Sequence, residues 1–279
     1  MDKKKVWFIT GASKGLGLSL VHQLLKAGQY VAATSRNIDE LKQAVATDSK
    51  KFLALSVNLS DEQSVEKAIK ATVTQFERID VIINNAGYGI GGSIEELSDA
   101  ETRNSFDINV FGTLNVIRKA SPYLRAQRSG HIINISSIAG ITGATGWAIY
   151  AAAKSAVISL SEILAEDLKD FGVKVTVVAP GAFRTSFLTA DSLTLAANPI
   201  AEYAAVRETH ARYLKMDGQQ IGDPEKAAAA MISLASMPNP PLHLLLGRDA
   251  FDRATAKIEA LSKEINEWKP ISISTDFDQ

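Results

Sequence analysis

Short runs of apolar, often β-branched residues recur along the first half of the chain, and longer amphipathic stretches separate them. Such runs, bounded by polar or glycine residues, are typical of buried strands. They predict strands at Val6–Ile9, Tyr30–Thr34, Phe52–Val57, Ile79–Ile83 and His131–Ile135. Strands that alternate with helices predict βαβ units, and therefore a parallel sheet with right-handed crossovers.

The segments between and after these strands carry helix signals. Leu16, Leu20 and Leu24 fall on one side of a helix that follows the first strand. Asp223 followed by Pro224 is a typical helix start, with the aspartate as cap and the proline in the first position. Helices are predicted over Tyr150–Leu164, Pro224–Met237 and Ala254–Trp268, and a last strand over Leu242–Leu246.

The last predicted helix is amphipathic, with Ile258, Leu261, Ile265 and Trp268 on one side. An apolar stripe of this kind packs against another surface. We therefore expect the helix to cover the substrate end of the molecule or a neighbouring subunit. The tail Ile271–Gln279 ends acidic and is expected to be mobile.

Length and composition are those of a globular protein with a sizeable core. Hydrophobic residues make up 46% of the chain and charged residues 22%. The 279 residues contain no linker, repeat or low-complexity segment at which to divide the chain. We expect one domain over residues 1–279, with a substrate lid at about 186–222 and a C-terminal helix and tail at 252–279.

Charge and cysteine usage exclude several kinds of partner. A net charge of −1 gives no general attraction to nucleic acid or to an anionic membrane, and we expect no segment able to span a bilayer. The chain has no cysteine, and its four histidines are widely separated, so neither disulfides nor a metal site are expected. We expect a cytoplasmic protein without nucleic-acid or membrane partners.

A glycine-rich segment joins the first strand to its helix, with Gly11, Gly15 and Gly17 in Thr-Gly-Ala-Ser-Lys-Gly-Leu-Gly. Such a turn lets the backbone approach a pyrophosphate at a helix N-terminus, where free N–H groups and the helix dipole favour an anion. A purely structural turn is the alternative. The position between strand and helix at the start of an α/β chain favours nucleotide binding.

The end of the second strand bears on the choice of cofactor. In dinucleotide-binding units an Asp or Glu at this place holds the ribose of NAD. Here the residues are Ser35 and Arg36, and neither is an acid. A hydroxyl and a guanidinium suit the 2′-phosphate of NADP, and Lys14 in the glycine turn adds a positive charge. The sequence predicts NADP (NADPH), with NAD as the weaker alternative.

Tyr150 and Lys154 are candidates for proton transfer. They are four residues apart, so a helix places them on the same face. A free phenol has a pKa of about 10, and an ammonium beside it is expected to lower that pKa toward neutrality. Ser137, which follows a predicted strand, could bind the oxygen that gains or loses the proton. An ordinary exposed helix face is the alternative for such a pair taken alone.

Several linked motifs resemble those of the short-chain dehydrogenases/reductases. In chain order they are Thr10–Gly17, Asn84–Gly87, Asn109, Ser137, Tyr150-x-x-x-Lys154, and Pro180-Gly181 followed by Thr185. Ser137 also precedes Tyr150 by thirteen residues, as is usual in that family. The resemblance implies an α/β, Rossmann-type, doubly wound and mostly parallel seven-stranded sheet with helices on both faces. It also implies a nicotinamide cofactor across the carboxyl ends of the strands.

The resemblance implies roles for individual residues. Tyr150 would be the catalytic acid/base, and Lys154 would lower its pKa and hold the nicotinamide ribose. Ser137 would bind the carbonyl oxygen, and Asn109 would support a water-linked proton relay to Lys154. Asn58 departs from the family, which often has an Asp that holds the adenine amino group, but an Asn carbonyl can accept the same bond. The expected cofactor contacts are Gly11, Ser13, Lys14, Gly15, Leu16, Gly17, Ser35, Arg36, Asn58, Leu59, Asn85, Ala86, Gly87, Tyr150, Lys154, Pro180, Gly181 and Thr185.

These features predict an NADP-dependent oxidoreductase that interconverts a carbonyl compound, a ketone or aldehyde, and an alcohol by hydride transfer. Halohydrin-cleaving relatives of the same fold replace the lysine and lose the glycine turn, and this chain has both. A non-catalytic NADP-binding sensor or interaction protein is the remaining alternative. Such proteins tend to lose part of the Ser-Tyr-Lys set, which is complete here.

The segment Phe183–Ile221 is expected to form the lid. Its apolar and aromatic residues are Phe183, Phe187, Leu188, Leu193, Leu195, Ile200, Tyr203, Tyr213 and Leu214. An apolar lid would exclude water and favour a bulky hydrophobic substrate, although packing of a pair of ordinary helices is the alternative for each residue. The resemblance further implies a homodimer or homotetramer formed through the helices that hold Asn109 and Tyr150.

Overall fold

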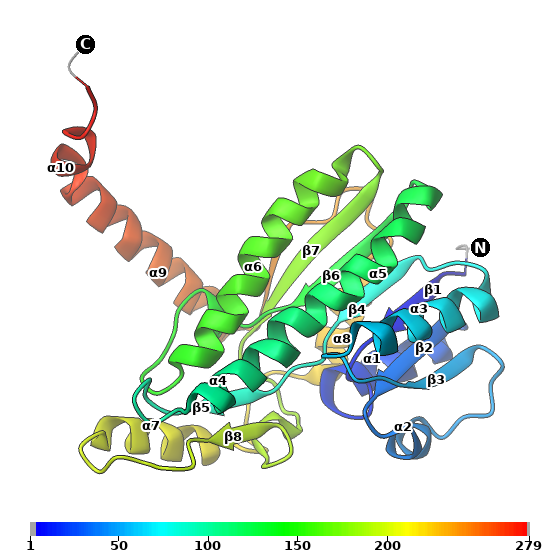
Figure 1. Cartoon of the computed structure of the whole chain (residues 1–279), viewed down its shortest axis with the longest axis horizontal. Coiled ribbons are helices and arrows are strands. Elements are labelled where there is room, and N and C mark those ends of the chain that lie inside the picture. The colour runs from blue at the N-terminus through cyan, green and yellow to red at the C-terminus, as the bar shows by residue number, and fades with distance from the viewer. Residues whose placement is uncertain (1–3, 278–279) are drawn as a thin grey trace.

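The structure is a computed structural model that describes residues 4–277. Its main sheet has seven strands in the order β3-β2-β1-β4-β6-β7-β9, and each neighbouring pair is parallel. Helices flank the sheet on both faces, as Figure 1 shows. The predicted doubly wound, Rossmann-type architecture is confirmed.

The elements alternate along the chain as the sequence pattern indicates. The strands of the main sheet are β1 (Val6–Ile9), β2 (Tyr30–Ser35), β3 (Phe52–Ser56), β4 (Val81–Asn84), β6 (Gly130–Ile135), β7 (Val173–Pro180) and β9 (His243–Leu246). A small second sheet pairs β5 (Gly89–Gly91) with β8 (Leu193–Leu195). The helices are α1 (Gly15–Lys26), α2 (Ile38–Val45), α3 (Glu62–Phe76), α4 (Asp99–Phe106), α5 (Gly112–Gln127), α6 (Ala148–Lys169), α7 (Ala204–Leu214), α8 (Pro224–Leu234), α9 (Arg248–Glu267) and α10 (Lys269–Ile273).

The predicted boundaries hold better for strands than for helices. Each predicted strand agrees with the observed one to within two residues at either end. Helix α6 extends beyond the predicted range at both ends, and α9 begins six residues earlier than predicted. Helix α10 occupies part of the segment that was expected to be a mobile tail, and residues 278–279 lie outside the described residues.

The alternation of side chains along the central strands builds two hydrophobic cores. Trp7 and Ile9 of β1 pack with Leu20 of α1 on one face of the sheet, whereas Phe8 between them packs on the other face. The first core also includes residues of α2 and α8, and the second includes residues of α3, α5 and α6. Because both faces are buried, the strands read as nearly continuous apolar runs.

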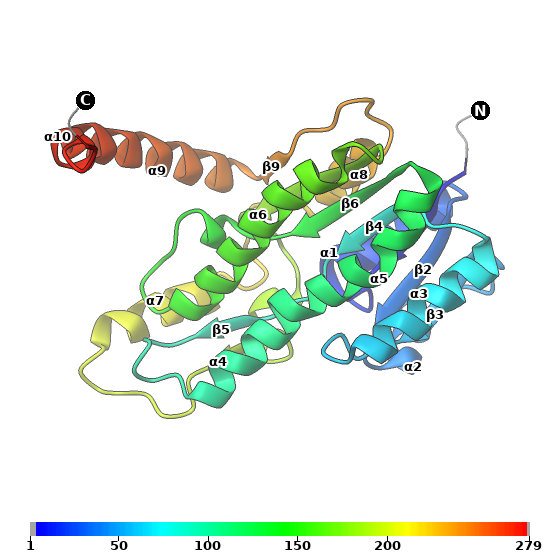
Figure 2. The same cartoon turned by 45° about the horizontal axis from the view of Figure 1, so that its top comes forward.

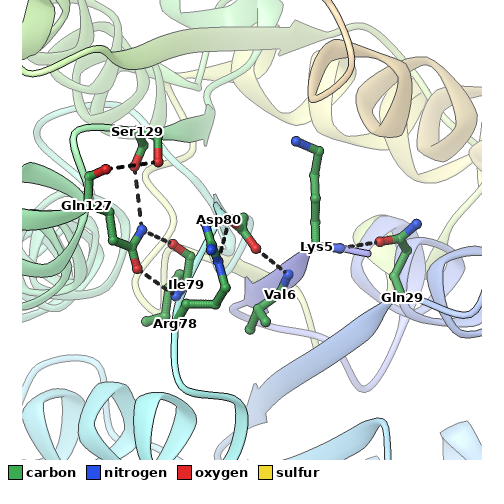
Figure 3. A network of polar contacts seen from close by, with 8 residues as sticks. All are labelled: Lys5, Val6, Gln29, Arg78, Ile79, Asp80, Gln127 and Ser129. Carbon is green, nitrogen blue, oxygen red and sulfur yellow. Dashed lines mark hydrogen bonds and ion pairs between the residues drawn. The ribbon is translucent and has the colours of Figure 1, made fainter. Parts of the chain in front are cut away.

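A network of polar contacts ties together the amino ends of β1 and β4 (Figure 3). The backbone N–H of Val6 donates to the Asp80 carboxylate at 2.8 Å, and Arg78 pairs with the same carboxylate at 2.6 Å. Gln127, at the end of α5, binds both the N–H and the C=O of Ile79, at 3.3 and 2.7 Å. These contacts fix the amino edge of the sheet and leave the carboxyl edge for a binding site.

Helix α6 is long and apolar enough to cross a membrane, judged by length and composition, with a mean hydropathy of 1.4. The expectation that no segment is able to span a bilayer does not hold for α6 by the criteria of length and composition. In the fold α6 packs against β7, and its buried residues include Tyr150, Lys154 and Val157. Packing within the protein buries 28% of this apolar window.

Helix α9 leaves the body of the protein after its first turns (Figures 1 and 2). Ala250 and Ala254 are buried in a small cluster with Ile138, whereas the rest of the helix lies away from the sheet in both views. Only the beginning of α9 therefore packs against the body of the same chain.

Candidate active site

A cavity of about 1840 Å³ opens at the carboxyl ends of the strands. The chain winds outward from β1 to β3 on one side and from β4 to β9 on the other, and open α/β sheets bind ligands at such a switch point. The volume exceeds the roughly 300–1,000 Å³ of a pocket for one small ligand, so it has room for a cofactor and a substrate. The predicted residues that line it are Gly11, Ser13, Lys14, Gly15, Leu16, Ser35, Arg36, Leu59, Asn85, Ala86, Gly87, Ser137, Tyr150, Lys154, Pro180, Gly181 and Thr185.

Three predicted residues do not line this cavity. Asn58 is exposed, and its side-chain oxygen accepts a hydrogen bond from the backbone N–H of Ser60 at 3.1 Å. The adenine contact of Asn58 stays a prediction, because a carbonyl oxygen that accepts one hydrogen bond in the turn before α3 can accept a second. Gly17 lies in the first turn of α1 against the backbone of Gly11, and Asn109 lies behind the loop that follows β4.

The glycine turn is shaped for close approach to a ligand. Gly11 has a φ of +66°, and a Cβ there would lie 2.7 Å from the Cα of Ala86. Asn85 holds the turn from the other side, because its side-chain amide donates to the backbone oxygens of Thr10 and Gly11 at 3.0 and 2.9 Å. Helix α1 begins at Gly15 without a side-chain cap, so its first N–H groups remain available to an anion.

Two basic side chains line the cavity near the end of β2 and the glycine turn. Arg36 is exposed at its wall, directly after β2. Lys14 also lines it, but its Nζ donates to the backbone oxygen of Asp191 at 3.2 Å. Arg36 is therefore the stronger candidate for a phosphate contact, and Lys14 also ties the lid to the glycine turn.

Ser137, Tyr150 and Lys154 meet at one wall of the cavity. Ser137 follows β6, and the other two lie on consecutive turns of α6. Tyr150 and Lys154 are 7% and 4% exposed. The Lys154 ammonium donates to the backbone oxygen of Ile135 at 3.0 Å and lies 5.9 Å from the centre of the Tyr150 ring. The structure thus brings together the three residues that the sequence motif singles out.

Asn109 lies near Lys154, on the far side of the loop that holds Gly87 and Tyr88. It lies in a π-helical segment, η1 (Asp107–Phe111), a type of irregularity that is frequent at functional sites. Its side chain binds both the C=O and the N–H of Tyr88, at 3.2 and 3.3 Å. A Cβ at Gly87 would lie 2.6 Å from Asn109 Oδ1 and 3.2 Å from Lys154 Nζ. Asn109 and Lys154 therefore approach each other across a backbone position that only glycine fits.

Burial sets the protonation states of Tyr150 and Lys154. Loss of hydration raises the pKa of Tyr150 to about 12, and a hydrogen bond with Ser137 offsets only part of this rise. Burial also lowers the pKa of Lys154 to about 8. The predicted lowering of the pKa of Tyr150 is therefore wrong, because desolvation dominates and only the hydrogen bond with Ser137 acts in the lowering direction. A phenol with this pKa is protonated at neutral pH and can act as a proton donor.

An aromatic cluster surrounds the phenol, and sequence reasoning missed part of it. Trp147 meets Tyr150 edge to face at 6.2 Å between ring centres, and Phe187 of the lid lies 5.8 Å away on a tilted plane. His210 and Tyr213 pack on Trp147 at 5.4 and 5.2 Å. Trp147 precedes Tyr150 by three residues, and this helical spacing is the signal that could have identified it.

The lid differs from a pair of ordinary helices. It consists of the short helix η3 (Ser186–Leu188), the strand β8 and the helix α7. Of its predicted apolar residues, the four that line the cavity are Phe183, Phe187, Leu188 and Tyr213. Leu193 is buried in the cluster around Trp147, and Leu195 and Leu214 are exposed. The lid therefore supplies an apolar wall, but with fewer residues than its composition indicates.

A buried carboxylate fastens the lid to the body. Glu96 accepts a hydrogen bond from the backbone N–H of Ile200 at 2.8 Å and pairs with Arg207 of α7. Burial alone would raise the pKa of Glu96, but hydrogen bonds from Ser93, Ile200 and Arg207 lower it to about 2. The carboxylate is therefore charged at neutral pH, and the lid is held over the cavity.

Asp249 of α9 is a second residue that sequence reasoning missed. One of its oxygens accepts from the backbone N–H of Ala182 at 2.8 Å, and a Cβ at Gly181 would collide with the carboxylate. The other oxygen is buried without a partner among the described residues. Asp249 therefore fixes the loop Pro180–Thr185 at the cavity. It lies beyond the reach of the recognised motifs, so no sequence signal marked it.

Comparison with known proteins places this geometry in a family. The family model for short chain dehydrogenases matches residues 5–195. An oxidoreductase of Botryotinia fuckeliana is 35% identical over 273 residues, which cover 97% of this chain and 99% of the relative. A 3-ketodihydrosphingosine reductase of Bacteroides thetaiotaomicron is 33% identical over 243 residues, with 87% and 88% covered.

Solved structures agree with this assignment. A short-chain dehydrogenase from Streptomyces avermitilis has a TM-score of 0.91 at 36% identity, covering 99% of this chain and 100% of that one. A structure of ElxO with NADP bound has a TM-score of 0.72 at 26% identity, with 88% and 97% covered. Together with the position of Ser137, Tyr150 and Lys154, these similarities show that the chain belongs to the short-chain dehydrogenase family, oxidoreductases that act on CH–OH or carbonyl groups.

Proposed function

We propose that this protein is an NADP-dependent oxidoreductase that interconverts a bulky, mainly apolar ketone or aldehyde and the corresponding alcohol. The observation that carries the proposal is the single cavity wall that holds Ser137, Tyr150 and Lys154 next to an apolar lid. The similarity to a 3-ketodihydrosphingosine reductase and to a structure with bound NADP supports it.

In the direction of reduction, the Ser137 hydroxyl binds the carbonyl oxygen and Tyr150 donates a proton to it. The phenol can do so because burial raises its pKa to about 12 and keeps it protonated. The oxygen becomes basic enough to take this proton as the carbonyl is reduced. Lys154 places a positive charge near the tyrosinate that remains. A bound nicotinamide cofactor supplies the hydride.

The cavity wall fits a dinucleotide in two respects. The uncapped start of α1 offers free N–H groups to a pyrophosphate. Gly11 and Gly87 let the backbone pack closely at the cavity wall, because a Cβ there would meet the backbone of Ala86 or the side chains of Asn109 and Lys154. On the nicotinamide side, the loop Pro180–Thr185 that Asp249 fixes would hold the ring. We therefore assign the start of α1, the backbone at Gly11 and Gly87, and the loop Pro180–Thr185 to the cofactor site.

We expect NADPH to be preferred over NADH, and Arg36→Leu to remove most of that preference. Hydrogen bonds to charged groups contribute about 1.5–3 kcal/mol, so loss of the guanidinium should weaken NADPH by about ten- to a hundredfold. NADH has no phosphate at this position and should be almost unaffected. The measurement is the Michaelis constant for each cofactor in the wild type and the variant.

Arg125→Leu is a matched control for this prediction. Arg125 is an exposed arginine near the end of α5, at the amino edge of the sheet, and it does not line the cavity. The substitution Arg125→Leu should leave the Michaelis constants for NADPH and NADH unchanged. Equal losses for the two cofactors in Arg36→Leu, or a wild type that prefers NADH, would show that Arg36 does not select the cofactor.

We expect bulky apolar carbonyl compounds to be reduced faster than small charged ones. Phe183, Phe187, Leu188 and Tyr213 line the cavity, and a charged group without a partner there would be heavily penalised. The test is the initial rate of NADPH oxidation with carbonyl compounds graded by size and polarity. A best substrate that is a small keto acid or sugar acid would end the apolar-substrate proposal. If the protein bound NADPH but reduced no member of the panel, this result would favour the alternative of a non-catalytic NADP-binding sensor.

The same proposal includes self-association through the helices that flank the site. Phe111 at the end of η1 and Ile163 on α6 are exposed apolar side chains on these elements. Their exposure supports the expected homodimer or homotetramer.

A further inference from the structure

The C-terminal helix exposes an apolar stripe that the catalytic site does not use. Every residue from 255 to 277 is exposed, and α9 projects from the body in both views (Figures 1 and 2). Four apolar residues of α9 and Trp268, which follows it directly, are 44–63% exposed; the four are Phe251, Ile258, Leu261 and Ile265. The stripe spans about 25 Å, from the rise of 1.5 Å per residue. Contiguous exposed apolar surfaces of this kind mark interaction sites.

The spacing of the stripe is that of a coiled coil. Phe251, Ile258 and Ile265 are seven residues apart, and Leu261 and Trp268 repeat the same interval three residues further on. A strict repeat of seven, with apolar residues at two positions, is the pattern by which one helix packs along another. Most helices gain their stability from such packing, and α9 beyond its first turns makes little contact with its own body.

We infer that α9 pairs with α9 of a second copy of this chain, side by side and in opposite directions. In this register Ile258 lies against Leu261 of the second copy, and Phe251 lies against Trp268 of the second copy. The two-fold axis repeats each contact, as a self-complementary interface requires. The two catalytic bodies then lie at opposite ends of the helix pair and do not compete for space.

The charges beside the stripe favour this arrangement. Lys257 and Glu264 both lie next to the apolar repeat, one position before Ile258 and Ile265. In the antiparallel register each Lys257 faces Glu264 of the second copy, so two ion pairs flank the seam. In a parallel register Lys257 would face Ser262 instead. Charge complementarity therefore selects both the partner and the direction.

A membrane is a weaker candidate for the occupant of this stripe. Helices that lie on membranes are rich in Lys and Arg on their polar face. Residues 255–277 carry three lysines against four acidic residues, which are Lys257, Lys263, Lys269, Glu259, Glu264, Glu267 and Asp276. The resulting balance of one negative charge opposes attraction to anionic lipid, so a second copy of the chain is the better fit.

The first test compares two double variants with the same change in charge. Ile258→Glu with Ile265→Glu places carboxylates in the seam, whereas Ala256→Glu with Ala260→Glu places them outside it. Sedimentation velocity over a dilution series should show that the seam variant has half the mass of the wild type. The control variant should keep the wild-type mass. Equal masses for all three proteins would overturn the inference.

The second test concerns direction. Lys257→Glu should halve the mass, because each new glutamate would face Glu264 of the second copy. Adding Glu264→Lys to this variant should restore the mass. An unchanged mass in Lys257→Glu, or binding of the wild type to phosphatidylserine vesicles without any paired species in solution, would contradict the antiparallel pair. Turnover is a separate readout, because none of these positions lines the cavity, so failure here leaves the proposed reaction untouched.

Discussion

Tyr150→Phe should lower turnover by about 10²–10⁴-fold, the range for loss of a general acid. The ring should still pack between Trp147 and Phe187, but it has no proton to donate to the carbonyl oxygen. NADPH affinity should remain close to that of the wild type, because the phenylalanine keeps the shape of the cavity wall. The measurement combines initial rates with cofactor titration by fluorescence.

Tyr30→Phe makes the same chemical change away from the site. Tyr30 begins β2 at the amino edge of the sheet, where its ring packs on Phe76. This control should keep wild-type turnover. Wild-type turnover in Tyr150→Phe would show that another group delivers the proton.

Lys154→Ala should damage turnover and cofactor affinity together. The ammonium lies beside the Tyr150 ring and against Gly87, where it reaches both the proton donor and the assigned cofactor site. We expect a loss of at least about 10²-fold in turnover. Loss of a charged hydrogen bond should weaken NADPH about ten- to a hundredfold. Lys169→Ala, at the exposed end of the same helix, is the matched control.

The pH dependence of reduction provides a second readout for Lys154. Its pKa is lowered to about 8 by burial, so it is mainly charged below pH 8 and mainly neutral above it. Turnover should therefore fall as the pH rises through about 8, while Tyr150, with its pKa raised to about 12, stays protonated. Lys154→Arg keeps its charge at these pH values and should move the fall to higher pH. If turnover of Lys154→Arg decreased at the same pH as that of the wild type, the decrease would reflect the titration of another group.

The sheet could be predicted from the sequence because its strands are buried on both faces and read as apolar runs. Val6–Ile9 is predicted with its observed bounds, and the turn after it is recognisable from its glycines. The wall formed by Ser137, Tyr150 and Lys154 was predictable for a similar reason, since it depends on motifs at the ends of strands and on helical spacing.

The parts that could not be predicted depend on contacts between distant segments. The lid is held by Glu96, more than a hundred residues before its partner Arg207. Asp249 accepts a hydrogen bond from Ala182, which lies 67 residues earlier in the sequence. The direction of the pKa shift at Tyr150 was missed because sequence spacing reveals the ammonium nearby but not the degree of burial.

The most direct test of the proposed reaction follows the hydrogen itself. NADPH deuterated at both hydrogen positions of nicotinamide C4 would be incubated with the best apolar ketone of the panel, and the alcohol analysed by mass spectrometry. We predict one deuterium on the former carbonyl carbon of each alcohol molecule, and almost no labelled product from Tyr150→Phe. Alcohol without deuterium, or no alcohol from any carbonyl compound while NADPH binds, would contradict it.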